Sequence, residues 1–137
     1  MRLLLLLLTC FSWPTAHAAK KITADKVLLV TVNETGTITV GRDTVSADNL
    51  ARYVQERLFK SFMGTGKMHD HIKLVKATDA VPDMVTTVVV EEIQSGQRKA
   101  LQELSLQKYR KKFDTLDAKK QGKLKKQFPV LFQSRFI

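Results

Sequence analysis

Two short runs of β-branched residues on either side of a glycine-containing turn constrain the fold of this chain most strongly. Lys26–Val32 reads KVLLVTV, and Thr37–Val40 reads TITV, with strict alternation of polar and apolar residues. Such alternation is typical of a strand with one buried and one solvated face. Asn33–Gly36 lies between the runs, and Asn and Gly tolerate the backbone angles of a tight turn. We therefore predict a β-hairpin over these residues.

A helix is predicted directly after a second turn at Gly41–Thr44. We expect Ser46 to be its N-cap, with the hydroxyl accepting a hydrogen bond from a free backbone N–H of the first turn. Five large apolar or aromatic residues then recur at helical spacing and form one stripe. Gly64 and Gly66 are expected to end this helix. The stripe consists of Leu50, Tyr53, Val54, Leu58 and Phe62.

The next segments predict a further strand and a second helix. His71–Lys76 (HIKLVK) alternates, which predicts a strand with Ile72 and Leu74 on one face. Met84–Ile93 (MVTTVVVEEI) is ambiguous, since its β-branched residues favour a strand, whereas the helical spacing of its valines and isoleucine favours a helix.

We predict a helix for this stretch, because Pro82 suits a first helical turn and Gly96 is suited to end it. Ala100–Gln107 (ALQELSLQ) is then expected to form a last strand. The predicted order is β-β-α-β-α-β, of the α/β (α+β) class, in two layers with the helices packed on one face of a small mixed sheet. If the strands flanking the second helix are parallel, a right-handed crossover would link them.

The N-terminus carries an apolar run that is too short to span a membrane. It extends from Leu3 to Trp13, about half of the roughly 20 residues that a spanning helix needs. Arg2, the leucine-rich middle and the small residues of Ala16–Ala18 follow the layout of a secretory signal that is cleaved after Ala18. We therefore expect export to the periplasm, at or near the inner membrane.

Two alternatives stay open for this segment. It could be retained as a short anchor, or Cys10 could mark a lipoprotein, although Thr9 is bulkier than the residue such signals prefer. Cys10 is the only cysteine. A chain cleaved after Ala18 would therefore contain no disulfide and would depend on its core for stability.

The net charge of +10 is concentrated near the C-terminus. Ala19–Gln107 contains 12 basic and 11 acidic residues, whereas Lys108–Lys126 contains nine basic and two acidic ones. A large positive charge can indicate nucleic-acid binding, but the nearly neutral body and the expected export argue against it. We predict a signal at 1–18, a body domain at 19–107 and a basic helical extension at 108–137, whose apolar end, Phe128–Phe132, folds back on the body or on a partner.

The basic residues of this extension are typical of a solvated helix, or of a contact for anionic lipid, cell-wall polymer or an acidic partner. The candidate contacts are Lys108, Arg110, Lys111, Lys112, Lys119, Lys120, Lys123, Lys125 and Lys126.

No residue pattern indicates an enzyme. His69–His71 could place two imidazoles on one face of a strand, but two ligands are too few for structural zinc. Ser46, His71 and Asp79 supply the residue types of a triad, but no nucleophile-elbow pattern surrounds the serine. Glu91–Glu92 is expected on the solvated face of a helix, and the sequence contains no phosphate-binding or dinucleotide-binding glycine motif. We predict no catalytic, metal or cofactor site.

Three segments in order resemble the periplasmic domain of the ExbD/TolR family. They are the hairpin VTVNETGTITV, then DTVSADNLARYV, then IKLVKATDAVP. In that family a hairpin with a glycine turn leads into a segment that begins a helix with a leucine, and a later strand ends in an alanine followed four residues on by Val-Pro. The resemblance covers residues 26–107. The matching positions are Gly36, Val45, Leu50, Ala77, Val81 and Pro82.

The resemblance implies a module of a biopolymer-transport system of the TonB or Tol type. Such proteins act beside an ExbB- or TolQ-like membrane motor that couples proton flow to energy transduction, so a homodimer and contact with that motor or with a TonB-like protein are expected. The chain departs from the family at Thr78, where an acidic residue is usual and Asp79 comes one position later. No acidic residue precedes Asp25, so the family's membrane aspartate has no counterpart. We expect an interaction module that does not itself conduct protons.

Two other functions are retained as alternatives. One is a full membrane-anchored ExbD-type transport subunit with a mis-assigned or degenerate N-terminus, and the other is a periplasmic binder of cell wall or anionic lipid through the basic extension. For the interaction module, the candidate edges for strand addition are Lys26–Val32 and Ala100–Gln107. The competing expectation is that the extension covers these edges, because proteins usually cover exposed hydrophobic edges.

Overall fold

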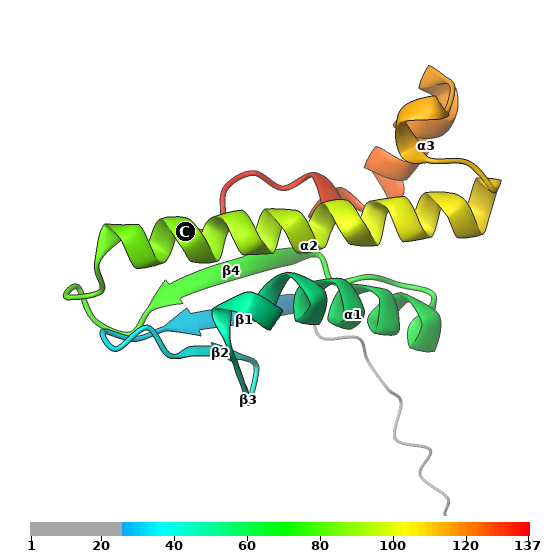
Figure 1. Ribbon diagram of the computed structural model, residues 1–137. Coiled ribbons are helices and arrows are strands. Elements are labelled where there is room, and N and C mark those ends of the chain that lie inside the picture. Colours follow the sequence, from blue (N-terminus) through cyan, green and yellow to red (C-terminus); the bar gives the residue numbers. More distant parts are fainter. Residues whose placement is uncertain (1–25) are drawn as a thin grey trace, which may run out of the picture.

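The computed structural model describes residues 26–137, in which two long helices lie over one face of a small mixed sheet (Figure 1). This confirms the predicted α+β class, whereas the signal, anchor and lipoprotein predictions lie outside the described residues. The strands are β1 Val27–Val32, β2 Ile38–Val40, β3 Asp43–Val45 and β4 His71–Lys76. The helices are α1 Ala47–Thr65, α2 Asp83–Tyr109 and α3 Ala118–Gln127, with short 3-10 turns η1 Phe113–Thr115 and η2 Pro129–Phe132.

The strand order in the sheet is β3-β2-β1-β4, so β1 is an internal strand. It pairs antiparallel with β2 and parallel with β4. The predicted hairpin is confirmed, and Gly36 takes a φ of 78° in its turn, with its N–H donating to the Asn33 carbonyl at 3.0 Å. Glycine adopts this left-handed conformation without the steric cost that a Cβ adds.

The segment after β2 contains a third strand that we did not predict. The turn is confined to Gly41 and Arg42, because β3 begins at Asp43 and pairs antiparallel with β2. Asp43 accepts a hydrogen bond from the hydroxyl of Tyr53 on α1, which joins this edge of the sheet to the helix layer. The same hydrogen bond raises the pKa of the Tyr53 hydroxyl.

The predicted last strand at Ala100–Gln107 is wrong, because these residues belong to α2. The parallel strands are therefore β1 and β4, and the connection between them contains α1. The crossover that we predicted through α2 is not formed, because no strand follows this helix within residues 26–137. Buried positions continue along α2 at helical spacing through Ala100, Leu101 and Leu104. This period places them on one face with Ile93, so burial favours a continuous helix.

No helix within residues 26–137 is long and apolar enough to cross a membrane.

Our prediction that Gly96 ends α2 is wrong, because this glycine lies inside α2 and faces α1. A Cβ at this position would lie 2.6 Å from the Ala51 carbonyl oxygen and 2.8 Å from the Val54 Cβ. The glycine is therefore required by a close approach of two helices. α2 ends at Tyr109, and its C-cap residue, Arg110, takes a φ of 57°.

The start and end of α1 agree with prediction in position. Ser46 is the N-cap residue, but its side chain makes no capping bond to a backbone N–H, contrary to our prediction. Its Oγ instead accepts a hydrogen bond from Asn49 Nδ2 at 2.9 Å. Gly66 is the left-handed C-cap, whereas Gly64 lies inside the helix. In the predicted stripe, Leu50, Val54 and Leu58 are buried, and Tyr53 and Phe62 are partly buried.

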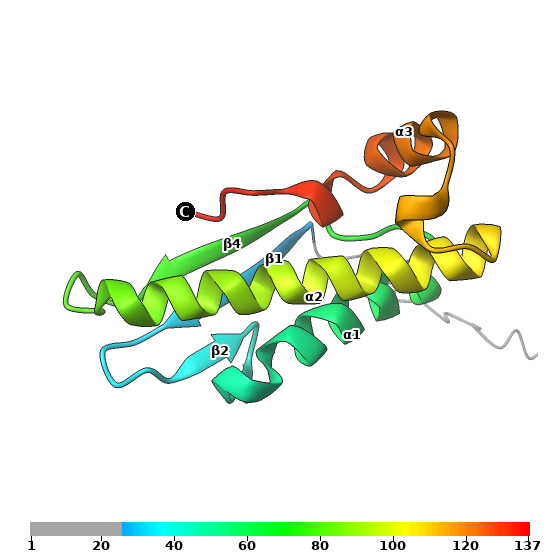
Figure 2. The same cartoon turned by 45° about the horizontal axis from the view of Figure 1, so that its top comes forward.

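The extension is helical at α3 and folds back along α2 toward β4 (Figure 2). Of the two alternatives predicted for its apolar end, packing on the body or on a partner, the structure shows packing on the body. The predicted domain boundary at residue 107 lies inside α2. The residues that the extension contributes to the common core are Leu116, Leu124, Phe128, Val130, Leu131 and Phe136.

Candidate interaction surfaces

Within the described residues, one face of the sheet has no helix over it. Alternate side chains of a strand point to opposite faces. Leu28, Val30 and Val32 point toward the helices and are buried, whereas Val27 and Leu29 are 36% and 40% exposed. These two apolar side chains therefore lie on the uncovered face in the N-terminal half of β1, beside β4. This open sheet face consists of Val27, Leu29, Thr31, Thr39, Thr44, His71, Lys73 and Val75.

The open sheet face is apolar at Val27 and Leu29 and carries little charge. The register of β1 and β4 places Leu29 beside Lys73 and Val27 beside His71. Lys73 is its only lysine or arginine, and none of its residues is acidic. A partner would therefore bind this face through apolar contacts and shape complementarity, with little contribution from ionic attraction.

The sequence contained a signal for this face that we did not use. Val27–Val30 is a run of four consecutive apolar residues, a pattern typical of strands that are covered on both faces. In the structure the helices cover one of those faces, so the outward members of the run, Val27 and Leu29, stay exposed.

Both candidate edges for strand addition are wrong. β1 is an internal strand, paired with β4 over its whole length and with β2 over Val30–Val32, and Ala100–Gln107 is helical. The edge strands are β3 and β4. The competing expectation was that the extension covers these two edges. It does cover a sheet edge, but that edge is the edge of β4.

The C-terminal segment covers β4 through backbone and side-chain hydrogen bonds. The Phe136 carbonyl accepts from Leu74 N at 2.8 Å. The amide of Gln133 accepts from Ile72 N at 2.8 Å and donates to Ile72 O at 2.7 Å, so one side chain satisfies two edge groups. Gln97 of α2, itself buried, donates to the carbonyl of Gln133 at 3.1 Å and thereby holds the segment in place.

The nine predicted basic contacts belong to the C-terminal end of α2, the linker around η1, and α3 (Figure 1). Three of them lie over aromatic rings, at 5.1–5.8 Å between the Nζ and the ring centroid, a range in which cation–π attraction operates. These pairs are Lys108 with Phe128, Lys120 with Tyr109, and Lys125 with Phe132. The other six are exposed: Arg110, Lys111, Lys112, Lys119, Lys123 and Lys126.

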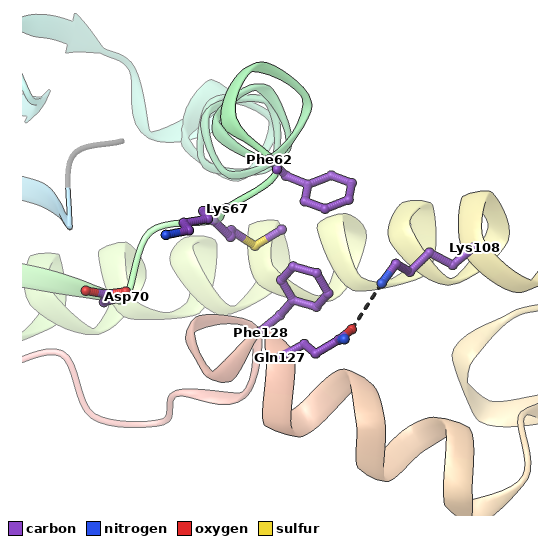
Figure 3. A pocket seen from close by; sticks show the side chains of 8 residues that line it. Phe62, Lys67, Asp70, Lys108, Gln127 and Phe128 are labelled. Atoms are coloured by element: carbon purple, nitrogen blue, oxygen red, sulfur yellow. Dashed lines mark hydrogen bonds between the residues drawn. The ribbon is translucent and has the colours of Figure 1, made fainter. Parts of the chain in front are cut away.

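A cavity of about 400 Å³ lies between the C-terminal end of α1 and the extension (Figure 3). The rings of Phe62 and Phe128 meet edge-on with their centroids 5.4 Å apart. Lys108 Nζ donates to Gln127 Oε1 at 3.0 Å, while Asp70 lies on the other side of the cavity. We assign this cavity to the packing of the extension on the body.

The residues considered for catalysis or metal binding are not brought together. His69 is buried ahead of β4, whereas the side chain of His71 is exposed on it. Asp79 follows the opposite end of β4, and a strand of six residues spans roughly 20 Å. Glu91 is exposed, as predicted for a solvated helix face, and Glu92 is half-buried. Within residues 26–137, no three His, Cys, Asp or Glu side chains form a group that could hold a metal ion.

The six positions that carry the family resemblance occupy the core, turns and element ends. Their members in the core are Val45, Leu50 and Val81. The others are Gly36 in the hairpin turn, Ala77, whose N–H donates to the Val32 carbonyl at 2.8 Å, and Pro82, the N-cap of α2.

No protein-family model fits the chain, and no curated protein matches its sequence. The fold and surfaces define the described residues as a two-layer α+β module with one uncovered sheet face and one basic end.

Proposed function

We propose that this chain is an ExbD/TolR-like periplasmic module of a TonB- or Tol-type biopolymer-transport system, which acts by protein–protein interaction and does not itself conduct protons. The observation that carries the proposal is the open sheet face, with Leu29 and Val27 exposed on an internal strand. The family resemblance supplies the system, and the apolar run Leu3–Trp13, which contains no carboxylate, is the reason for leaving out the proton step.

The partner that suits this face is a second copy of the chain. Two sheets that pack face to face lie about 10 Å apart and interdigitate their side chains. The face contains no acidic residue that would need a cation opposite it, and its threonines and valines suit packing against a like surface. The covered edge of β4 disfavours edge-to-edge pairing of two copies through that strand, and the other edge strand, β3, has only three residues.

The size of the face predicts a weak dimer. β1 and β4 have six residues each and are roughly 20 Å long, whereas β2 and β3 have three each and are roughly 10 Å long. Four such strands about 4.8 Å apart would bury on the order of 600 Å² in total, below the ~1,000 Å² typical of a stable specific interface. Burying a leucine contributes about 1.5–3 kcal/mol, so Leu29 is a large share of the association energy. We expect dissociation constants in the micromolar range or weaker, and a further contact with an ExbB/TolQ-like motor or TonB-like protein in the membrane.

Sedimentation velocity over a range of concentrations tests this proposal. The parent chain is expected to shift from monomer toward dimer as concentration rises, and Leu29→Glu to remain monomeric because it places a charge in the interface. Val88→Glu is the matched control, since Val88 on α2 is 41% exposed, as Leu29 is 40%. A parent chain that stays monomeric at millimolar concentration, or a dimer that only Val88→Glu disrupts, would contradict the proposal.

The membrane-anchored alternative is distinguished by the N-terminal mass of the protein recovered from cells. A mature chain that starts at Ala19 supports the exported module. Retention of residues 1–18 supports the anchored subunit.

A further inference from the structure

The lysines of α3 fall into two groups with different surroundings. Lys120 and Lys125 lie over the rings of Tyr109 and Phe132, and Lys120 also pairs with Asp117 at 3.4 Å. Lys119, Lys123 and Lys126 are exposed, and within residues 26–137 they have no ion pair, hydrogen bond or ring contact. The first group holds α3 to the body, and the second is free to meet a ligand.

The three outward lysines form one straight stripe. Their spacing of i, i+4 and i+7 places them on one side of a helix. At a rise of about 1.5 Å per residue, Lys123 and Lys126 lie about 6 Å and about 10 Å from Lys119 along the helix axis. Leu124, the only leucine of α3, is fully buried on the opposite side. The stripe is therefore charged and convex, without an apolar side chain that could insert into a bilayer.

This stripe is fixed in position before any ligand binds. Asp117 caps α3 by accepting a hydrogen bond from Lys120 N at 2.9 Å, and Phe128 directly after the helix is buried. A fixed array loses less conformational entropy on binding than lysines on an unfolded tail.

The basic end of the molecule is also the end at which the chain enters the sheet. The Lys26 carbonyl accepts a hydrogen bond from Asp70 N at 2.8 Å, and Asp70 lines the same cavity as Lys108 and Gln127. The start of β1 and the C-terminal end of α3 therefore lie near each other, on either side of this cavity.

We propose that Lys119, Lys123 and Lys126 dock this end of the protein on a surface of anionic phospholipid headgroups. A flat array of phosphates fits a convex stripe of three cations, whereas a single polymer chain is better held in a groove. The attraction is electrostatic and is worth about fivefold in binding for each lysine near such a surface. The assignment does not depend on the open sheet face or on the biopolymer-transport role.

Co-sedimentation of the full chain with vesicles tests the docking. The probes are vesicles of phosphatidylcholine with 30% phosphatidylglycerol and vesicles of phosphatidylcholine alone; the second set reports any binding through the N-terminal apolar run. We expect a clear preference for the anionic vesicles. Lys119→Gln, Lys123→Gln and Lys126→Gln together should reduce that binding on the order of 100-fold, and 0.5 M salt should reduce it for the parent chain.

The control is a triple variant with the same change in net charge, made at exposed basic residues outside both α3 and the open sheet face: Arg42→Gln, Lys60→Gln and Lys99→Gln. It should bind anionic vesicles within a few-fold of the parent. Far-ultraviolet circular dichroism checks that both variants keep their helices. Equal losses in the two variants, equal binding to both kinds of vesicle, or binding to soluble polyglutamate in preference to anionic vesicles would each overturn the proposal.

Discussion

At the scale of single residues, Gly96 decides how the helix layer is built. Its missing side chain lets α2 approach the backbone of α1, with the virtual Cβ only 2.6 Å from the Ala51 carbonyl oxygen. A backbone atom cannot rotate away as a flexible side chain can, so a methyl group there must displace a helix.

We predict that Gly96→Ala destabilises the protein by about 1–3 kcal/mol, the usual cost of overpacking a core. Gly122→Ala in α3 is the matched control, because a Cβ there has no atom within 4 Å. Its effect should have the opposite sign, with a gain of about 0.5–1 kcal/mol from helix propensity. Urea denaturation of both variants measures the difference, and a neutral Gly96→Ala would contradict the close packing.

At the scale of elements, the extension is joined to the sheet by two glutamines. Gln133 bonds to both backbone groups of Ile72 on β4, and Gln97 donates to the carbonyls of Val130 and Gln133 at 2.7 and 3.1 Å. A free edge would present unpaired N–H and C=O groups that invite other chains. The extension is therefore a structural part of the sheet layer as well as a basic appendage.

Gln97→Met should therefore loosen the C-terminal segment. The variant keeps the side-chain volume but leaves the buried Val130 carbonyl and the partly buried Gln133 carbonyl without their donor, at a cost of about 1–3 kcal/mol. We expect faster hydrogen exchange of the Leu74 amide, which bonds to Phe136. Gln107→Met on the exposed side of α2 is the control, and unchanged exchange at Leu74 in Gln97→Met would argue against the role of Gln97.

The N-terminal cap of α3 predicts a pH dependence. The hydrogen bond from Lys120 N lowers the pKa of the Asp117 carboxyl below its ordinary value of 3.8. A lowered folded-state pKa means that the cap contributes stability above pH 3.8, and that this contribution is lost as the pH falls through the folded-state pKa. Asp117→Asn keeps an acceptor but does not titrate, so the stability difference between the parent and this variant should shrink from pH 5 to pH 2. A difference that does not vary with pH would contradict this prediction.

At the scale of the whole molecule, short sequence patterns predicted the elements that have a clear turn residue or hydrophobic period. The β1–β2 hairpin follows from its glycine turn, and α1 and β4 from their periods. Some of the misses depend on contacts between distant segments, and others on elements too short to leave a pattern. Gly96 resembles a helix stop until α1 is placed against it, and β3 has only three residues within a turn-like sequence.

The surfaces were harder to predict than the elements, because each depends on which neighbours cover it. The edge of β4 is closed by Gln133, 61 residues away in sequence, and no period or motif marks that pairing. The basic residues were evident from charge alone, but their division into ring-stacked and outward lysines required the positions of Tyr109, Phe128 and Phe132.

The most direct test of the account asks whether two copies meet through the open sheet face. In a Cys10→Ser background, which leaves no other cysteine, Leu29→Cys and Val88→Cys each introduce one thiol at similar exposure. A short bis-maleimide reagent should link the Leu29→Cys chain into a covalent dimer and leave the Val88→Cys chain largely monomeric, as read by mass spectrometry. Equal cross-linking at the two positions, or cross-linking at Val88→Cys alone, would contradict the open sheet face as the interaction surface.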